Sequence, residues 1–138
     1  MSAKDIFHQV VIDALENEEW EITHDPFKIG IGSIEYRIDL GAERVIGASK
    51  GNEKIAVEIK SFIGQSKTYE LHNAIGQFNN YVVALEEIEP DRKLYLAIPS
   101  YIFGGLFQEP IVQKTVNRYK INLVVVDVNK KKIKKWIK

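Results

Sequence analysis

A carboxylate and an ammonium group stand two residues apart in an otherwise apolar run, "KIAVEIKSF" at 54–62. Side chains two positions apart on a strand project to the same side, so Glu58 and Lys60 share one face. The opposite face carries Ile55, Val57 and Ile59. Two interpretations are open. The pair is an ion pair on a half-exposed strand, or it belongs to a metal-dependent phosphodiesterase site.

A second carboxylate, Asp39, lies in the preceding extended run, within "RIDLGAE". If the two runs pair as a hairpin, Asp39 and Glu58 approach one point. Two carboxylates suit Mg²⁺ or Mn²⁺, because Mg²⁺ keeps several waters and takes further oxygens from a phosphate. A neighbouring lysine can hold the attacking water or stabilise developing charge. Alternatively, Asp39 stabilises a turn before Gly41, and Glu43 is either the true ligand or a surface partner of Arg44.

Polar residues on the next segment share one helix face. Gln77 and Tyr81 lie four apart in "GQFNNYVVAL", which has helical periodicity. Alone they would be ordinary helix residues. Because they follow the Glu58–Lys60 strand, we expect them to face the rim of the same pocket, where they can contact phosphate or anchor the strand.

The three histidines have both structural and functional interpretations. His8 is either a polar residue on the face of an N-terminal helix or a metal ligand. His24 and Asp25 precede Pro26, and we expect a turn there rather than a site. His72 lies in the helical segment, where we expect it to be solvated.

Periodicity then predicts the elements that must position these residues. We expect helices at 3–19, 68–88 and 109–119, with Ser2 and Asp5 forming a capping box at the first. We expect strands at 34–40, 44–49, 54–62, 94–100, 121–128 and 132–138, with a turn at 50–53. Residues 34–62 read as an antiparallel meander, 94–100 as a central strand and 132–138 as an edge strand. The order predicts an α/β fold with a mixed β-sheet flanked by α-helices.

The C-terminal segment "NKKKIKKWIK" holds six lysines and no acid. Two interpretations carry equal weight. The lysines form a solvated edge strand that resists aggregation, or they follow a phosphate backbone while an indole offers a stacking surface. The candidate nucleic-acid-binding residues are Lys130, Lys131, Lys132, Lys134, Lys135 and Trp136.

Composition bounds the remaining possibilities. At 138 residues we expect one domain, 1–138. The chain has no cysteine, which excludes disulfides and thiolate metal sites. Its net charge of zero gives no indication that the chain binds nucleic acid. We see no signal peptide and no apolar stretch of membrane-spanning length, so we expect a cytoplasmic protein.

An aspartate, then Glu-x-Lys, then a helix bearing Gln-x-x-x-Tyr resembles the PD-(D/E)xK nuclease superfamily, in particular its RecB-like branch. Nearly the whole chain resembles the XisH family, the fdxN element excision controlling factors. This resemblance rests on "AKDIFH", "THDP", "DLGAE", "KIAVEIKSF", "GQFNNY", "LYLAIP" and the terminal "KWI".

The resemblance implies a restriction-endonuclease-like (PD-(D/E)xK) core. It implies that Asp39 and Glu58 hold the metal, that Lys60 is the catalytic lysine and that Gln77 and Tyr81 form the helix motif. In RecB-like enzymes a histidine of the preceding helix is a further ligand, and His8 is the candidate. One departure is visible, since Ile38 stands where the superfamily pattern has proline before the aspartate.

The family's role is site-specific excision of the fdxN DNA element in heterocyst-forming cyanobacteria. There the excision is attributed to a separate recombinase, and a companion protein, XisI, is associated with the family. Two functions are therefore expected. One is a Mg²⁺-dependent nuclease acting on DNA, and the other is a non-catalytic regulatory module that binds DNA, the recombinase or the companion. A homo-oligomer is a further expectation.

Overall fold

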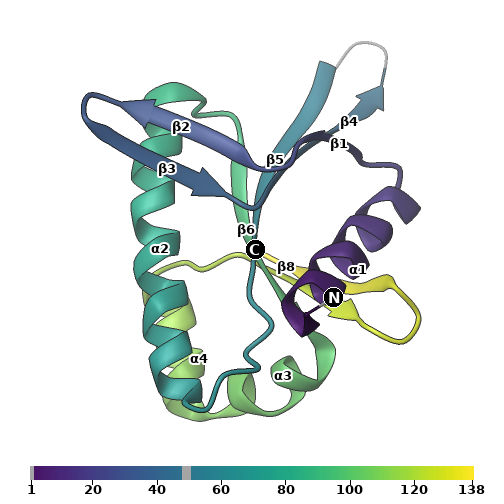
Figure 1. Ribbon diagram of the computed structural model, residues 1–138, viewed down its shortest axis with the longest axis vertical. Helices are drawn as coiled ribbons and strands as arrows, with labels where there is room; N and C mark the ends of the chain where they lie inside the picture. Colours follow the sequence, from purple (N-terminus) through teal and green to yellow (C-terminus); the bar gives the residue numbers. More distant parts are fainter. Residues whose placement is uncertain (1, 48–50) are drawn as a thin grey trace.

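The protein was analysed as a computed structural model, which describes residues 2–47 and 51–138. Its strands form a six-stranded sheet in the order β1-β4-β5-β6-β7-β8 and a separate two-stranded ribbon, β2-β3 (Figure 1). The strands are β1 (Glu21–His24), β2 (Phe27–Ile31), β3 (Ile34–Ile38), β4 (Leu40–Gly47), β5 (Gly51–Ile59), β6 (Lys93–Pro99), β7 (Leu123–Asp127) and β8 (Lys132–Ile137). The helices are α1 (Ala3–Asn17), α2 (Lys67–Ile88), α3 (Ser100–Gly104), α4 (Pro110–Arg118) and the 3₁₀ turn η1 (Leu106–Gln108).

The six-stranded sheet is mixed. Strands β5, β6 and β7 run parallel, whereas β1, β4 and β8 join antiparallel at the two sides. The central strand β6 is buried along nearly its whole length, as its apolar sequence predicts. Strand β8 lies at an edge, which confirms the prediction for the C-terminal segment.

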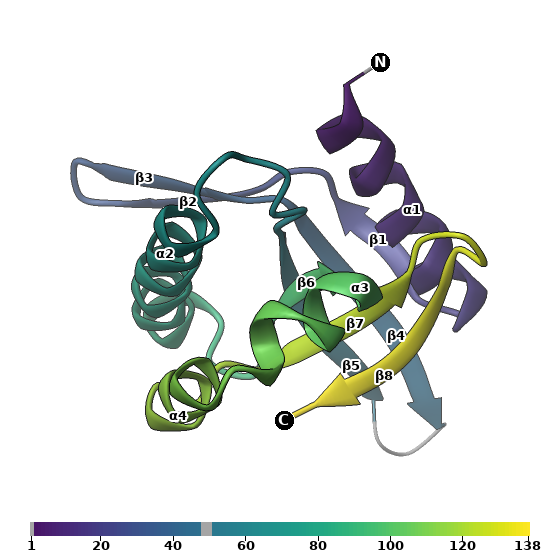
Figure 2. The ribbon, with the colours of Figure 1, turned by 90° about the horizontal axis from the view of Figure 1, so that it is seen from below.

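Helices cover both faces of the sheet. Helix α1 packs on one face, and α2, α3 and α4 pack on the other (Figure 2). Strand β5 contributes to both layers, because Ile55 and Val57 face the α1 side while Ala56 faces the α2 side. Both residues of the α1 side are buried, as predicted, whereas Ile59 is only half-buried. The mixed α/β fold with a helix-flanked sheet is therefore confirmed.

Helix starts follow the local sequence. The Ser2 hydroxyl accepts a hydrogen bond from the Asp5 amide at 3.2 Å, so the predicted N-cap is present. Ser66 caps α2 in the same way, accepting from the Tyr69 amide at 3.1 Å. Within the described residues, none of these helices has the length and apolar character that a membrane crossing requires.

Three sequence predictions need correction. The strand expected at 34–40 is interrupted at Asp39, because β3 pairs with β2 while β4 pairs with β5, so 34–62 is not one meander. Residues 51–53 of the expected turn belong to β5, and Lys50 lies outside the described residues. Strands β1 and β2, together with α3 and η1, were not predicted.

The β2-β3 ribbon forms an arm that projects past α2 (Figures 1 and 2). Its base is anchored by Phe27, Ile29 and Ile38, which are buried in the α2-side core. The Tyr36 ring meets the Tyr81 ring of α2 edge to face, with centroids 5.5 Å apart. Asp39 comes directly after this anchored arm, at the point where the chain passes into the main sheet.

Candidate functional site

The two predicted carboxylates meet across the β4-β5 hairpin. The strand register pairs Leu40 with Val57, which places Asp39 beside Glu58. The Ile59 amide donates to Asp39 Oδ2 at 2.8 Å, and the Asp39 amide donates to Glu58 Oε1 at 3.3 Å. The main chain of each strand thus orients the carboxylate of the other. Asp39 is bound to β5 rather than to a turn before Gly41.

Glu58 is a buried acid, with 5% of its surface exposed. Burial raises the pKa of Glu58 to about 8, and the neighbouring Asp39 carboxylate adds to the rise. Lys60 opposes the rise, since a nearby cation favours the ionised form. Burial and the Asp39 carboxylate outweigh the effect of Lys60, so the pKa of Glu58 stays raised.

Lys60 shares the face of Glu58, as the strand period predicts. Its Nζ lies 3.6 Å from Glu58 Oε2, too far for a good hydrogen bond. This separation agrees with the raised pKa of Glu58, because a close ion pair would have lowered it. The Lys60 amide donates to the Ala97 carbonyl of β6 at 3.0 Å, so the main chain holds the residue at the end of the parallel strands.

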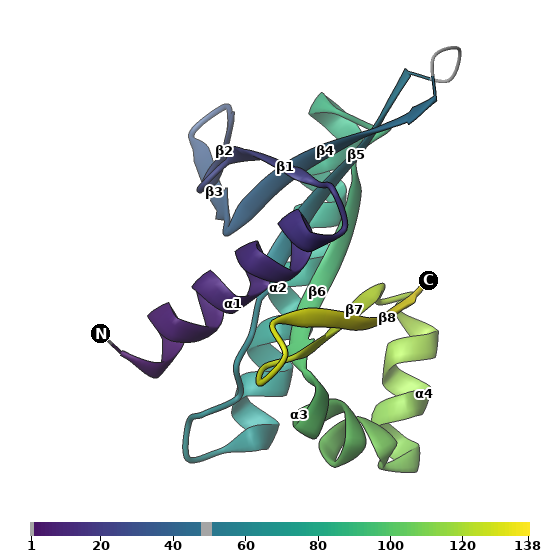
Figure 3. The ribbon, with the colours of Figure 1, turned by 90° about the vertical axis from the view of Figure 1, so that its right-hand side faces the viewer.

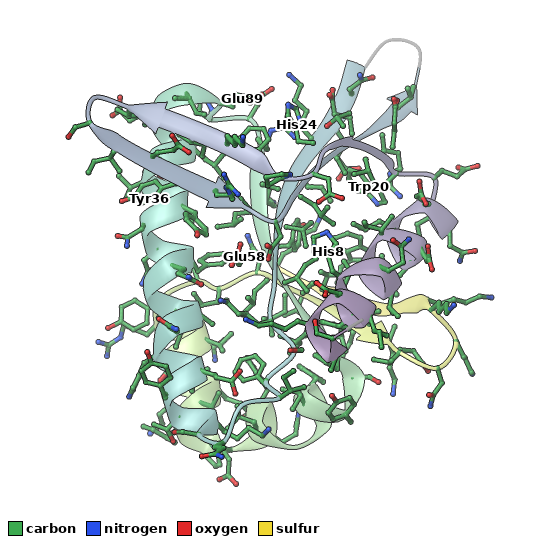
Figure 4. All side chains as sticks on the ribbon, in the orientation of Figure 1. His8, Trp20, His24, Tyr36, Glu58 and Glu89 are labelled. Carbon is green, nitrogen blue, oxygen red and sulfur yellow. The ribbon has the colours of Figure 1, made fainter. Side chains whose placement is uncertain are left out.

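These side chains open into a cavity of about 290 Å³ between α1, the end of β5 and the start of α2. Glu58 of β5 and His8 of α1 both line this cavity (Figure 4). The cavity is lined by Lys4, Asp5, Phe7, His8, Asp39, Glu58, Ile59, Lys60, Ser61, Glu70 and Asn73. Acidic and basic side chains are therefore mixed on its wall.

His8 lies on this wall, but its ring is engaged elsewhere. Its Nε2 is 3.0 Å from Asp25 Oδ1, in the segment between β1 and β2. Among the described residues, no group of three or more histidine, aspartate or glutamate side chains is arranged to hold a metal ion. A cation at this site would therefore rest on Asp39 and Glu58, with His8 available only through its other nitrogen.

Gln77 and Tyr81 do not line the cavity. The Tyr81 hydroxyl donates to the Arg37 carbonyl at 3.2 Å, two residues before Asp39. Burial raises the pKa of Tyr81 to about 12, with the Glu58 and Asp39 carboxylates adding to the rise. Gln77 Oε1 is buried without a hydrogen-bond partner among the described residues.

Sequence reasoning missed the wall that faces Lys60. Glu70 Oε2 accepts from the Gly64 amide at 2.8 Å, and a Cβ at Gly64 would lie 2.7 Å from that oxygen. Lys67 donates to the Phe62 carbonyl, and Phe62 is buried with a φ of 56°. The first turn of α2 thus fastens the loop that follows Lys60. The glycine and a helix-start glutamate six residues later were the available sequence signals.

The C-terminal lysines lie on the exposed edge strand and on the turn before it. Trp136 is half-buried: its Nε1 donates to Glu18 at 3.0 Å, and its ring lies 4.9 Å from that of Tyr95. Lys135 Nζ lies 4.5 Å above the Phe103 ring. Much of the indole is therefore packed within the fold, while the lysines keep their solvent contact.

The remaining candidates have local partners. The His24 ring lies 2.9 Å from the Thr23 hydroxyl and packs on Phe27. Arg44 pairs with Glu53 at 2.9 Å rather than with Glu43, which accepts weakly from Asn52 at 3.4 Å. His72 is exposed on α2, as expected.

The donor set fits Mg²⁺ or Mn²⁺ in a limited way. Both metals accept carboxylate oxygens, and Mg²⁺ is often held by only one or two carboxylates with waters and substrate phosphates. Asp39 and Glu58 supply such a pair. Burial is the main cause of the raised pKa of Glu58, and a cation between the two carboxylates would offset the added contribution of Asp39. The fit is to a substrate-assisted site rather than to a cage built wholly from protein ligands.

Known proteins are similar to this chain in sequence and fold. The family model described as XisH protein matches residues 1–134. An XisH family protein from Nostoc punctiforme is 40% identical, with a TM-score of 0.89, and the match covers 97% of this chain and 100% of that one. An fdxN element excision controlling factor protein from Anabaena variabilis is 41% identical, with a TM-score of 0.89 and coverages of 97% and 99%. The curated proteins contain no match.

Proposed function

The chain belongs to the XisH family, and from this premise we propose that it is a controlling factor for excision of the fdxN DNA element that carries a Mg²⁺-dependent phosphodiesterase site. The name of the Anabaena variabilis protein supports the first part of this proposal. The second part rests on the cavity. We further propose that residues 1–138 form one restriction-endonuclease-like domain of the PD-(D/E)xK type.

One observation carries the chemical proposal. Asp39 and the buried Glu58 converge in a cavity that also receives the Lys60 ammonium group. Glu58 has the Lys60 ammonium group at 3.6 Å and a second carboxylate beside it, so two acids share one nearby lysine. The acidic pair is thus suited to a cation that the chain itself does not supply.

Each residue would have a distinct task. Asp39 and Glu58 would hold Mg²⁺ or Mn²⁺, and the amides of Ile59 and Asp39 would keep their carboxylates oriented. The metal, when bound, supplies Lewis-acid stabilisation of the phosphate and a more acidic water. Lys60 would place its ammonium group against the attacking water or the charge that develops on the phosphate. Tyr81 would act indirectly, by holding the arm next to Asp39.

Binding of DNA would involve a second region. The exposed lysines of β8 and of its preceding turn would supply contacts to the phosphate backbone, which are sequence-independent and weaken with salt. The XisI-like companion and a site-specific recombinase are the proposed protein partners of the excision role.

The test is cleavage of linear, nicked and branched DNA with Mg²⁺ or Mn²⁺, with and without the companion. Lys60→Ala is expected to slow cleavage by about 10²–10³ while largely preserving DNA binding. Lys54→Ala is the matched control. It removes a half-exposed lysine near the opposite end of β5, whose nearest carboxylates are 3.8 and 3.9 Å away. The nuclease proposal fails if the wild-type chain cleaves no DNA form, or if Lys60→Ala cleaves as fast as wild type.

A second candidate is a regulatory module that has the same cavity but no catalytic activity. It is favoured by the lack of a third acidic or histidine ligand among the described residues and by the engagement of His8 with Asp25. In that case wild type shows no cleavage, and Lys60→Ala leaves excision and partner binding unchanged. Titration with Mn²⁺ separates a metal-binding module from one that binds no metal, with Glu58→Gln as the control.

A further inference from the structure

One side of α2 is exposed from Tyr69 to Val83 in the part of the chain that the structure describes. Two large apolar side chains stand on it, Tyr69 and Val83, with 67% and 62% of their surfaces exposed. Exposed Asn73, Gly76 and Asn80 lie between them. Spacings of four, three, four and three residues place all five on one side of a helix, and we call them the α2 stripe.

Gly76 at the centre of the stripe has no explanation within the chain. Glycine in a helix interior is less favourable than alanine, because it loses more backbone freedom on folding. A Cβ at this position would have no atom within 4 Å, and the residue does not adopt a positive φ. Packing and backbone conformation therefore both allow alanine. What glycine provides here is the close approach of another surface from outside.

Charge argues against a nucleic acid as the molecule that covers the stripe. Between Glu70 and Glu86, α2 carries no aspartate, glutamate, lysine or arginine, although 28% of the chain is charged. Binding to phosphate backbones depends on lysine and arginine, which this surface lacks. A partner with strong charge of either sign would likewise find no complement along the stripe.

The spacing favours a second copy of the chain. Tyr69 lies seven residues before Gly76 and Val83 lies seven residues after it, while Asn73 and Asn80 flank it closely. We propose that two copies pair through their α2 stripes, antiparallel and crossing near Gly76. The two-fold axis then places Tyr69 of each copy against Val83 of the other, with asparagines facing each other nearer the axis. A two-fold interface requires such a self-complementary surface.

The ends of α2 support the antiparallel arrangement. Glu86 and Glu87 lie in the last turn, where no basic residue offsets the negative end of the helix dipole. Antiparallel pairing brings these acids to the positive N-terminal end of the other α2, whose first turn carries both Lys67 and Glu70. At about 1.5 Å per residue, the helix is long enough for both ends to take part.

The β2-β3 arm adds a second contact region. It projects past α2 (Figures 1 and 2), and its tip carries Ile31 and Ile34, with 38% and 53% of their surfaces exposed. These two residues are paired in the ribbon register, so they stand together at the tip. Beside a second copy, the tip would cover apolar surface that now faces solvent.

Dimerisation does not depend on the proposed nuclease function, since no residue of the acidic pair takes part. Asn73 also lines the cavity, so the interface would adjoin the candidate site. A failed cleavage assay would leave the dimer untouched, and a monomeric chain would leave the cavity untouched.

Sedimentation or light scattering over a concentration series tests the proposal, with circular dichroism to verify folding. Wild type is expected to dimerise. Val83→Glu is expected to weaken the dimer at least about tenfold, because it places a carboxylate in an apolar contact on each side of the axis. Gly76→Ala is expected to raise the melting temperature of the monomer and yet weaken the dimer. These two effects have opposite signs, and a purely structural role for Gly76 would not produce both.

Ile111→Glu is the matched control. Ile111 is an apolar residue on α4, 70% exposed, and its replacement is expected to leave the dimer intact. The proposal is overturned by a wild-type chain that stays monomeric at every concentration, by a Val83→Glu chain that dimerises like wild type, or by loss of the dimer in Ile111→Glu alone.

Discussion

Two charged side chains are equally buried in this protein, yet their surroundings differ. Glu58 and Arg92 each expose 5% of their surface and lie toward opposite ends of β5. The Arg92 guanidinium donates to the Ile55 carbonyl at 2.9 Å and to Glu89 at 3.2 Å, and it lies 4.7 Å above the Phe27 ring. Among the described residues, Glu58 accepts one long hydrogen bond, from the Asp39 amide at 3.3 Å, and lies 3.6 Å from the Lys60 ammonium group.

The two buried charges differ in how many partners the chain supplies for them. Buried charges are stable when the chain supplies their partners. Arg92 has two carbonyls, a carboxylate and an aromatic ring, although its Nε finds no hydrogen-bond partner among the described residues. For Glu58, burial raises the pKa and the neighbouring Asp39 carboxylate adds to the rise. A buried acid of this kind lowers stability, and under the proposed function a bound cation would offset that cost.

The largest expected effect concerns Arg92. Arg92→Met keeps the apolar stem but leaves buried carbonyls without a donor, each costing about 1–3 kcal/mol, so we expect unfolding to become easier by roughly 2–4 kcal/mol. Urea denaturation measures this. Lys54→Met, a change in a half-exposed lysine near the same end of β5, should stay within about 0.5 kcal/mol. Equal effects in both variants would show that burial of Arg92 contributes little.

Val57 lies on β5 between Ile55, whose carbonyl Arg92 contacts, and Glu58. A substitution here measures how much β5 contributes to stability. It is fully buried against α1, so Val57→Ala should lower the free energy of unfolding by about 1–3 kcal/mol through a cavity. Thermal or urea unfolding measures the change. A free energy of unfolding close to that of wild type would show that β5 is peripheral to the core.

Titration of Glu58 should make the free energy of unfolding depend on pH, whereas Arg92 stays charged and should add no such dependence. Its folded pKa of about 8 lies above the ordinary value of 4.5, so the folded state retains a proton that the unfolded state releases. This contribution is complete below pH 4.5 and is lost as pH rises to about 8, at roughly 1 kcal/mol per pH unit.

Urea titrations at several pH values measure that slope. Glu58→Gln should remove this component of the slope, because the amide does not titrate. Mg²⁺ should flatten it in wild type if the cation binds the carboxylates. An unchanged slope in Glu58→Gln would mean that another group causes it.

The smallest effect is expected for Tyr81→Phe. Loss of the 3.2 Å hydrogen bond to the Arg37 carbonyl should cost about 0.5–1.5 kcal/mol in unfolding free energy. Because Arg37 precedes Asp39 by two residues, Mn²⁺ affinity should fall as well. A variant that loses stability but retains full Mn²⁺ affinity would assign Tyr81 to the anchoring of the arm alone.

Local pattern predicted much of the fold. The period of two in "KIAVEIKSF" separated the core residues Ile55 and Val57 from Glu58 and Lys60, because successive strand side chains alternate between faces. Helix periodicity predicted α1, α2 and α4, and the all-apolar "LYLAIP" predicted a central strand. Strand β2 was missed because its pairing partner and its burial against α2 are not visible in five residues.

By itself, the sequence determined the residue types of the site and their common strand face, since both depend on spacing along one chain segment. The tertiary structure decided what surrounds them. Asp25 engages His8, Glu70 fastens the loop after Lys60, and Tyr81 turns to the Arg37 carbonyl instead of the cavity. These contacts join elements whose relative positions come from packing on the two faces of the sheet. The burial that sets the pKa of Glu58 arises in the same way, because desolvation is a property of the whole assembled core.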